Sequence, residues 1–146
     1  MIVRAAMDID APPEVVWRVF SRLEEWESWN TACDSCRLTA GERLEAGACL
    51  TFVVKPFVFP VRVAPRVVLC EPGREVVWEG GRWGIHAVHR WRFVERPGGV
   101  RLESTETFGG PLMPIARLFG LQRRLHRLTE RMLSQICTQS EACAAG

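Results

Sequence analysis

Residues 118–136, LFGLQRRLHRLTERMLSQI, decide the fold class because they contain one regular row of apolar side chains. The row recurs at intervals of three and four residues, so on a helix it forms one narrow stripe with arginines on the opposite side. A long amphipathic helix of this kind must lie on another apolar surface. The stripe consists of Leu118, Leu121, Leu125, Leu128, Met132 and Ile136, and the arginines are Arg117, Arg123, Arg124, Arg127 and Arg131.

The centre of the chain, residues 33–109, has the composition and alternation of β-strands. Val, Phe, Trp and Thr are frequent there, and Pro-Gly turns at 71–74 and 96–99 are typical of hairpins. Another strand is expected at Ile2–Ile9, followed by a short helix at Val15–Leu23. The central strands expected are Arg37–Ala40, Cys49–Phe57, Val58–Cys70, Glu75–Glu79, Ile85–Glu95 and Val100–Phe108.

Together these elements predict an α+β domain in which a curved antiparallel sheet of about six to seven strands wraps around a long C-terminal helix. We expect one domain over residues 1–146, with a disordered tail at about 141–146. Because alternate strand residues share a face, Leu50, Phe52 and Val54 are assigned to the inward face. The same alternation assigns Ile85, Ala87, His89, Trp91 and Phe93 to that face.

Composition limits the function classes. The 146 residues are 47% hydrophobic and 25% charged, which is typical of a globular domain. A formal net charge of +2 does not suggest nucleic acid as a partner. No stretch reaches 18 apolar residues and the N-terminus lacks a secretory apolar segment, so we expect a cytoplasmic protein without integral membrane association. The six cysteines are therefore expected to be reduced.

Five stretches between about Ile2 and Ser140 carry a resemblance to a known family: Ile9–Trp17, Trp26–Asn30, Val76–Gly80, His89–Phe93 and Glu106–Leu112. They resemble the START-like helix-grip superfamily (SRPBCC), also described as polyketide cyclase/dehydrase and lipid transport proteins. Members commonly have Pro after the Trp-Asn pair, where this chain has Thr31. The resemblance implies an internal apolar cavity between sheet and helix, used by different members for lipid or aromatic ligand binding, ring cyclisation or partner binding.

Large side chains are expected on both walls of that space. If they interdigitate completely, they form an ordinary core; if they line a gap, they form an apolar ligand pocket. The candidate ligand-binding residues are Trp26, Trp29, Phe52, Val54, Phe57, Phe59, Trp78, Trp91, Phe108, Leu118, Leu121 and Leu125.

The last predicted hairpin brings two ionisable residues together. With the turn at 96–99, Glu95 pairs with Val100, and His89 then lies opposite Glu106 on the inward face. A carboxylate beside an imidazole would fix the imidazole tautomer and raise its proton affinity, which suits a general base. His89 and Glu106 are therefore the candidate catalytic residues. The alternative is a polar pair that satisfies its own hydrogen bonds.

Other chemistries lack the residues they need. The chain has no GxSxG, P-loop or GxGxxG motif, and we expect no cofactor. Cys33 and Cys36 form a CxxC without a second pair, and residues three apart on a strand point to opposite faces. His86 and His89 are separated in the same way. No metal site is therefore expected. The arginine side of the last helix is expected to be solvated, with an anionic membrane surface or an acidic partner as the alternative.

Three hypotheses follow from these observations. The first is a protein that binds a hydrophobic small molecule, lipid-like or aromatic, between sheet and helix, with His89 and Glu106 as polar anchors. The second is a polyketide cyclase or dehydratase type of enzyme that uses the same pair. The third is a protein-interaction module with a filled core. The sequence does not determine the oligomeric state, and a homodimer is one candidate.

Overall fold

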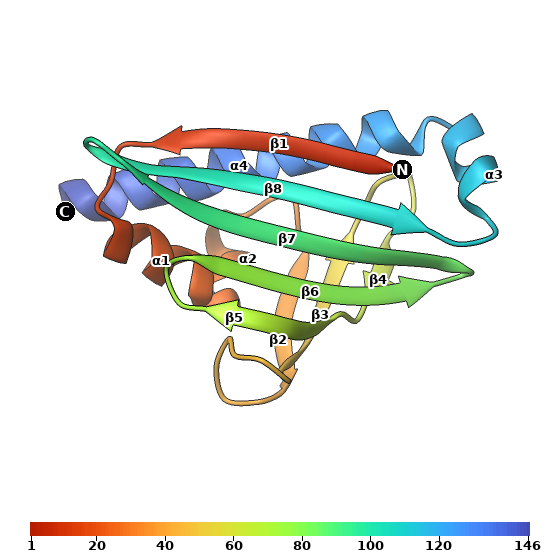
Figure 1. Ribbon diagram of the computed structural model, residues 1–146, viewed down its shortest axis with the longest axis horizontal. Helices are drawn as coiled ribbons and strands as arrows, with labels where there is room; N and C mark the ends of the chain where they lie inside the picture. Colours follow the sequence, from red (N-terminus) through yellow and green to blue (C-terminus); the bar gives the residue numbers. More distant parts are fainter.

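The computed structural model describes residues 1–146, which form a strongly curved antiparallel sheet with helices on its concave side (Figure 1). The strand order is β1-β8-β7-β6-β5-β3-β2, and β4 pairs with β3. This confirms the predicted fold class. The strands are β1 (Ile2–Ile9), β2 (Ser35–Ala40), β3 (Cys49–Val54), β4 (Val61–Val63), β5 (Arg66–Glu71), β6 (Glu75–Arg82), β7 (Ile85–Arg96) and β8 (Gly99–Gly109). The helices are α1 (Pro13–Ser21), η1 (Leu23–Glu25), α2 (Trp26–Trp29), α3 (Met113–Leu118) and α4 (Leu121–Ala145).

The β7–β8 hairpin has the predicted register. Glu95 pairs with Val100, and His89 pairs with Glu106. The turn works because Gly98 adopts a φ of 82°, which residues with a Cβ rarely adopt. A single turn of defined geometry therefore sets which side chains meet farther along the two strands.

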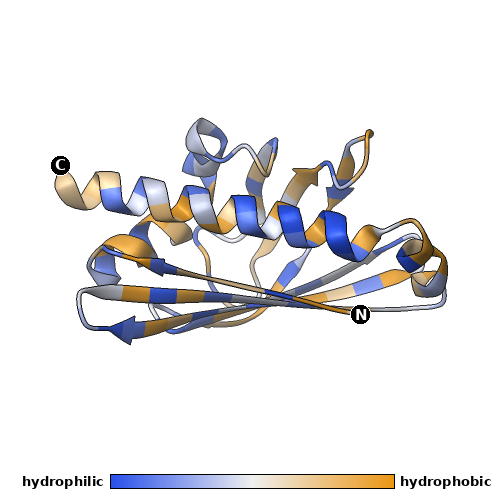
Figure 2. Ribbon diagram, turned by 90° about the horizontal axis from the view of Figure 1, so that it is seen from above, coloured by the Kyte–Doolittle hydropathy of each residue, from blue (hydrophilic) through white to orange (hydrophobic).

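The helical C-terminal region is divided in two. Gly120, with a φ of 73°, separates α3 from α4, so the apolar stripe begins at Leu121. Leu118 ends α3 and is 84% exposed, which corrects its predicted place in the stripe. The apolar period alone does not show the break, because Gly120 lies between two residues that fit it. From Leu121 onward, α4 lies across one face of the sheet, alongside β1 and α1 (Figure 2).

The tail expected to be disordered is helical as far as Ala145. Ser140 is fully buried, and the side chain of Glu141 accepts a hydrogen bond of 3.0 Å from the backbone N–H of Asp10. These tertiary contacts hold α4 against the segment after β1 as far as Glu141, and the exposed residues 142–145 continue the helix. Sequence patterns near a terminus do not report such contacts.

The expected strand over Val58–Cys70 is two shorter strands, β4 and β5. Pro56 and Pro60 bracket the loop before β4, and proline cannot donate a hydrogen bond to a strand ladder. Side chains alternate between the two faces of the sheet only as far as the hydrogen-bonded strand extends, and β3 ends at Val54. Phe59 is accordingly 49% exposed, which corrects its predicted inward position, whereas Phe57 turns inward from the same loop.

Two apolar clusters form the interior. The larger has 22 buried residues around Phe20, Trp26 and Trp91. The smaller consists of Val3, Phe108, Met113, Leu121 and Leu125. Within the larger, the indole N–H of Trp26 donates to the carbonyl oxygens of Val19 and Phe20, at 3.2 and 3.1 Å. This tie anchors the segment between α1 and β2.

The loop after α2 departs from the pattern of the family it resembles. Thr31, where family members commonly have Pro, donates its backbone N–H to the side chain of Gln135 on α4, at 2.7 Å. Proline has no N–H and could not make this bond. Cys33 and Cys36 follow and are both buried, because β2 begins only at Ser35 and the two residues do not share one extended strand. No helix in the structure is long and apolar enough to cross a membrane.

Candidate functional site

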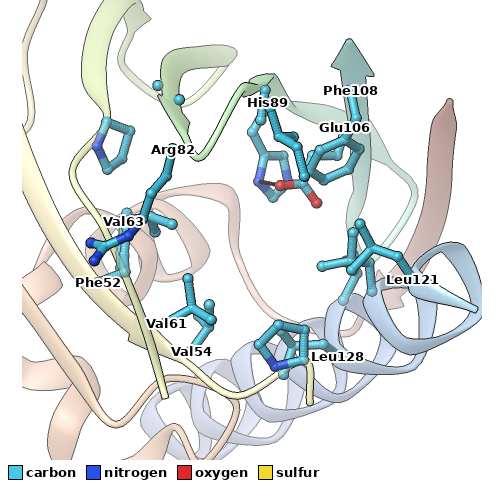
Figure 3. Close-up of a pocket in the computed structure, with 18 of the residues that line it drawn as sticks. Phe52, Val54, Val61, Val63, Arg82, His89, Glu106, Phe108, Leu121 and Leu128 are labelled. Carbon is cyan, nitrogen blue, oxygen red and sulfur yellow. Dashed lines mark ion pairs between the residues drawn. The ribbon is translucent and has the colours of Figure 1, made fainter. Parts of the chain in front are cut away.

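The two apolar clusters are separated by a cavity of about 250 Å³. Trp26, Phe52 and Trp78 of the larger cluster line it from one side, and Phe108, Leu121 and Leu125 of the smaller cluster from the other. Sixteen of its 24 lining residues are hydrophobic. The sheet and α4 therefore enclose a space that their side chains do not fill (Figure 3).

The cavity opens at one end of the molecule. Its exposed lining residues, Gly81, Arg82 and Trp83, come from the β6–β7 hairpin, and half-buried Phe57 and Ala116 come from the β3–β4 loop and α3. The opening therefore lies between these three segments.

Eight of the twelve predicted ligand-binding residues line the cavity, and four do not. Trp91 lies behind His89, fully buried, because its inward-facing neighbours cover it. Trp29 is half-buried beside Trp26, with ring centroids 5.9 Å apart, and does not reach the cavity. Phe59 and Leu118 are exposed for the reasons given above. The eight are Trp26, Phe52, Val54, Phe57, Trp78, Phe108, Leu121 and Leu125.

Several lining residues are not among the predicted ones. Ile85 and Ala87 are missed although strand alternation already places them inward, and Leu128 and Met132 although they belong to the apolar stripe of α4. The inward face and the apolar stripe show which side chains point toward the interior, but periodicity does not show which of them border an unfilled space. The β4 residues and Arg82 carry no signal that points to a cavity.

Two ionisable side chains of the inner cavity wall, His89 and Glu106, point into the space from adjacent strands (Figure 3), and the buried hydroxyl-bearing residue Thr129 lines it from α4. The imidazole Nδ1 lies 3.7 Å from Glu106 Oε1, and the two side chains are 11% and 18% exposed. The imidazole Nε2 shares a hydrogen bond of 2.7 Å with the Ser104 hydroxyl. Trp91 stacks on the imidazole, with centroids 4.3 Å apart, so the ring is held in one orientation.

Electrostatics reverse the roles that the sequence suggests. Burial lowers the pKa of His89 to about 3, because the apolar surroundings disfavour the imidazolium. Burial also raises the pKa of Glu106 to about 7, because the carboxylate is poorly solvated. The expectation that the carboxylate raises the proton affinity of the imidazole is therefore wrong. At 3.7 Å the two groups are too far apart to form a tight ion pair, and the cost of desolvation dominates.

The pair is consequently uncharged in mildly acidic solution, and its carboxyl group titrates near neutrality. A protonated Glu106 can donate a hydrogen bond to an oxygen in the cavity, and an ionised Glu106 can accept a proton from a ligand. The neutral imidazole can exchange one hydrogen bond with a guest through Nδ1 while Ser104 occupies Nε2. No three metal-ligating side chains come together in the structure.

Comparison with known proteins agrees with this architecture. The family model described as polyketide cyclase / dehydrase and lipid transport matches residues 1–141. None of the curated proteins matches the sequence.

Solved structures with the same fold cover the whole chain. TTHA0849 from Thermus thermophilus is 20% identical with a TM-score of 0.83, and the match covers 99% of each chain. The ZhuI aromatase/cyclase from Streptomyces sp. R1128 is 16% identical with a TM-score of 0.85, over 100% of this chain and 98% of that one. A START superfamily protein from Mycobacterium smegmatis is 14% identical with a TM-score of 0.69, over 99% and 97% of the two chains. Likeness at these identities establishes the fold.

Proposed function

The chain belongs to the polyketide cyclase/dehydrase and lipid transport family, and we propose that it binds an apolar small molecule with one or two fused rings in the cavity between sheet and α4. The observation that carries this proposal is an unfilled, mainly apolar space of about 250 Å³ inside an otherwise well-packed domain. Protein interiors are normally packed without such voids, so one of this size marks a place for a guest.

The size of the cavity restricts the guest. A cavity of about 150 Å³ accommodates benzene, so about 250 Å³ suits one or two rings. A long acyl chain or a four-ring molecule would need a wider space or would extend through the opening. The aromatic side chains of Trp26, Phe52 and Trp78 favour a flat guest, since ring faces and edges pack closely.

Glu106 adds a requirement for polarity. A buried carboxyl group without a full set of partners costs free energy, and a guest that carries a hydroxyl or carbonyl group would relieve this cost. We therefore propose that the guest places one such oxygen next to Glu106 and its apolar body toward α4.

A series of ring sizes tests the proposal. Calorimetric titration with phenol, 2-naphthol and a hydroxylated four-ring aromatic should show 2-naphthol binding about thirty-fold more tightly than phenol, because the second ring buries additional apolar surface. The four-ring compound should bind more weakly than 2-naphthol because it exceeds the cavity. Absence of binding for all three, or affinity that keeps rising with ring number, would contradict the proposal.

A second candidate function is ring closure of the polyketide cyclase type, and one observation favours it. Glu106 titrates near neutrality inside an apolar cavity, which is the environment of a general base. Relatives of the fold include the ZhuI and StfQ aromatase/cyclase structures. In this scheme the Glu106 carboxylate removes a proton from a carbon between two carbonyl groups. The resulting carbanion bonds to the carbon of another carbonyl group farther along the substrate chain. The alkoxide formed at that carbonyl then takes the proton back from Glu106.

The pH dependence of such a reaction shows whether Glu106 or His89 is the general base. With a linear β-polyketone as substrate, kcat/KM should rise with pH through about 7 and level off above, because the base must be ionised. Glu106→Gln should lower kcat at least about a hundred-fold, and Glu106→Asp should keep the limb near pH 7. A limb near the ordinary histidine pKa of about 6.5 that survives Glu106→Gln and disappears in His89→Ala would assign the base to His89 instead.

A further inference from the structure

Exposed apolar side chains gather around the opening of the cavity. We define the mouth segments as residues 55–63, 80–87 and 109–129, which include the β3–β4 loop, the β6–β7 hairpin, and α3 with the first turns of α4. Ten large apolar side chains in the whole chain are exposed, and seven of them belong to these segments. They are Val58, Phe59, Trp83, Leu112, Ile115, Leu118 and Phe119. Val58 is 97% exposed and Leu118 84%, so both protrude.

The mouth segments converge in space. A side chain at Gly84 would lie 3.4 Å from Leu112, which places the β6–β7 hairpin against the segment before α3. Phe57 packs against the apolar cluster that contains Met113 and Leu121, which places the β3–β4 loop against α3 and α4. Figure 1 shows α3 and the β6–β7 turn together at one end of the molecule. The exposed apolar side chains therefore belong to segments that meet at the cavity opening, and we call these side chains the rim. Trp83 lines the opening itself, whereas Phe119 borders a neighbouring surface hollow beside Ile2 and Arg4.

The charge of this rim differs from that of the rest of the protein. The mouth segments contain seven of the 19 basic residues and none of the 17 acidic ones. Lys55 is paired with Asp34, but the six arginines of these segments make no ion pair. Elsewhere, eight arginines have acidic partners, from Arg22 to Arg101. The unpaired arginines are Arg62, Arg82, Arg117, Arg123, Arg124 and Arg127.

Two of these guanidinium groups lie directly on aromatic rings of the rim. Arg82 lies 4.6 Å from the ring centroid of Trp83, and Arg124 lies 5.3 Å from that of Phe57. Each pair presents an apolar body with a cation beside it. Tryptophan and arginine in this arrangement suit the boundary between lipid tails and phosphate headgroups. Figure 2 shows the hydrophilic first turns of α4 next to the apolar α3.

We propose that the mouth segments dock the protein on the surface of an anionic lipid bilayer, with Val58, Trp83 and Leu118 among the lipid tails and the arginines at the phosphates. The apolar side chains protrude from three separate segments. A protein partner would need pockets that match the positions of these side chains, whereas fluid lipid tails can pack around apolar side chains in any arrangement. No helix could span the membrane, so the attachment is peripheral. Docked in this way, the cavity opens toward the bilayer, and an apolar guest can enter without crossing water.

Vesicle binding without any ligand tests this surface separately from the proposed ligand binding. The protein should co-sediment with vesicles of phosphatidylcholine containing about 30% phosphatidylglycerol, bind pure phosphatidylcholine vesicles much more weakly, and be released at high salt. Leu118→Ser and Val58→Ser should each weaken binding about ten-fold. The double variant Arg117→Gln/Arg123→Gln should weaken it about twenty-five-fold, since each cation contributes about a factor of five.

Matched controls lie on other faces. Val68→Ser on β5 and Arg18→Gln on α1 remove an exposed apolar residue and an unpaired arginine without touching the mouth segments. Both should leave vesicle binding unchanged, and all variants should still bind 2-naphthol if the cavity is occupied as proposed. Absence of binding to anionic vesicles, as expected if the basic rim serves an acidic protein, would overturn the proposal. Equal losses in Val68→Ser and Leu118→Ser would also overturn it.

Discussion

Filling the cavity by Ala87→Trp is expected to lower the affinity for 2-naphthol at least about a hundred-fold. Ala87 lies opposite Phe108 in the β7–β8 ladder and lines the cavity. An indole side chain at this position would occupy the space that we assign to the guest. A two-ring guest buries apolar surface on the scale of an aromatic side chain, so its exclusion removes about 4 kcal/mol of binding free energy.

The same substitution should not unfold the protein, because an indole in an unfilled apolar space gains contacts rather than forcing neighbours apart. Calorimetry with 2-naphthol and urea unfolding followed by circular dichroism measure the two quantities. Ala142→Trp, on the exposed last turns of α4, is the matched control and should bind as the wild type does. If a folded Ala87→Trp variant still bound 2-naphthol normally, the guest would have to lie elsewhere.

Glu106→Gln is expected to raise the free energy of unfolding by about 3 kcal/mol at about pH 8.5 and to change it little at about pH 4. The folded-state pKa of Glu106 is about 7, above its ordinary value of 4.5. Between pH 4.5 and about pH 7 the folded state keeps a proton on Glu106 that the unfolded state releases. The stability of the wild type therefore falls as the pH rises through this window. The pKa difference of about 2.5 corresponds to about 3 kcal/mol, and glutamine never ionises.

His89 changes the pH dependence of stability in the opposite direction to Glu106. Its folded-state pKa of about 3 lies below its ordinary value of 6.5, so the unfolded state takes up a proton first as pH falls below 6.5. The wild type therefore loses stability toward acid as well, and the two slopes oppose each other between pH 4.5 and 6.5. Urea unfolding across about pH 4 to 9 separates the contributions.

Glu103→Gln is the control for this measurement. Glu103 lies on the outward face of β8, 3.5 Å from an exposed Arg92, so its removal should cost less than about 1 kcal/mol. An effect of Glu106→Gln that is the same at both ends of the pH range would show that the carboxyl group does not titrate in this window.

The pairing of His89 with Glu106 shows which features of the site can be predicted from local sequence patterns. Strand alternation and one Pro-Gly turn are sufficient to place the two residues opposite each other on the inward face, and the structure has this register. The period of two makes a strand face predictable, and the turn fixes the offset between strands. The direction that the sequence predicts for the pKa of His89 is wrong, because this pKa depends on burial, which is a property of the whole enclosure.

The incorrect site residues have related causes. Phe59 and Leu118 fit the apolar periods of a strand and a helix. However, β3 ends at Val54 and leaves Phe59 in a loop, and Gly120 separates Leu118 from α4, so both side chains are exposed. Trp91 faces inward as expected, yet it lies beneath His89 rather than at the cavity surface. The overall charge is another example: a net +2 hides a strong separation between a basic rim and an acidic remainder.

The sequence by itself determined the α+β class, the order of strands and helix, the β7–β8 register and the family to which the chain belongs. These features depend on residue periods and turn chemistry within a few neighbours along the chain. Only the tertiary structure decided that the core is divided by a cavity, that Glu106 rather than His89 titrates near neutrality, and that three distant basic segments surround one opening. Volume, solvation and surface charge are sums over side chains that meet only when the chain is folded.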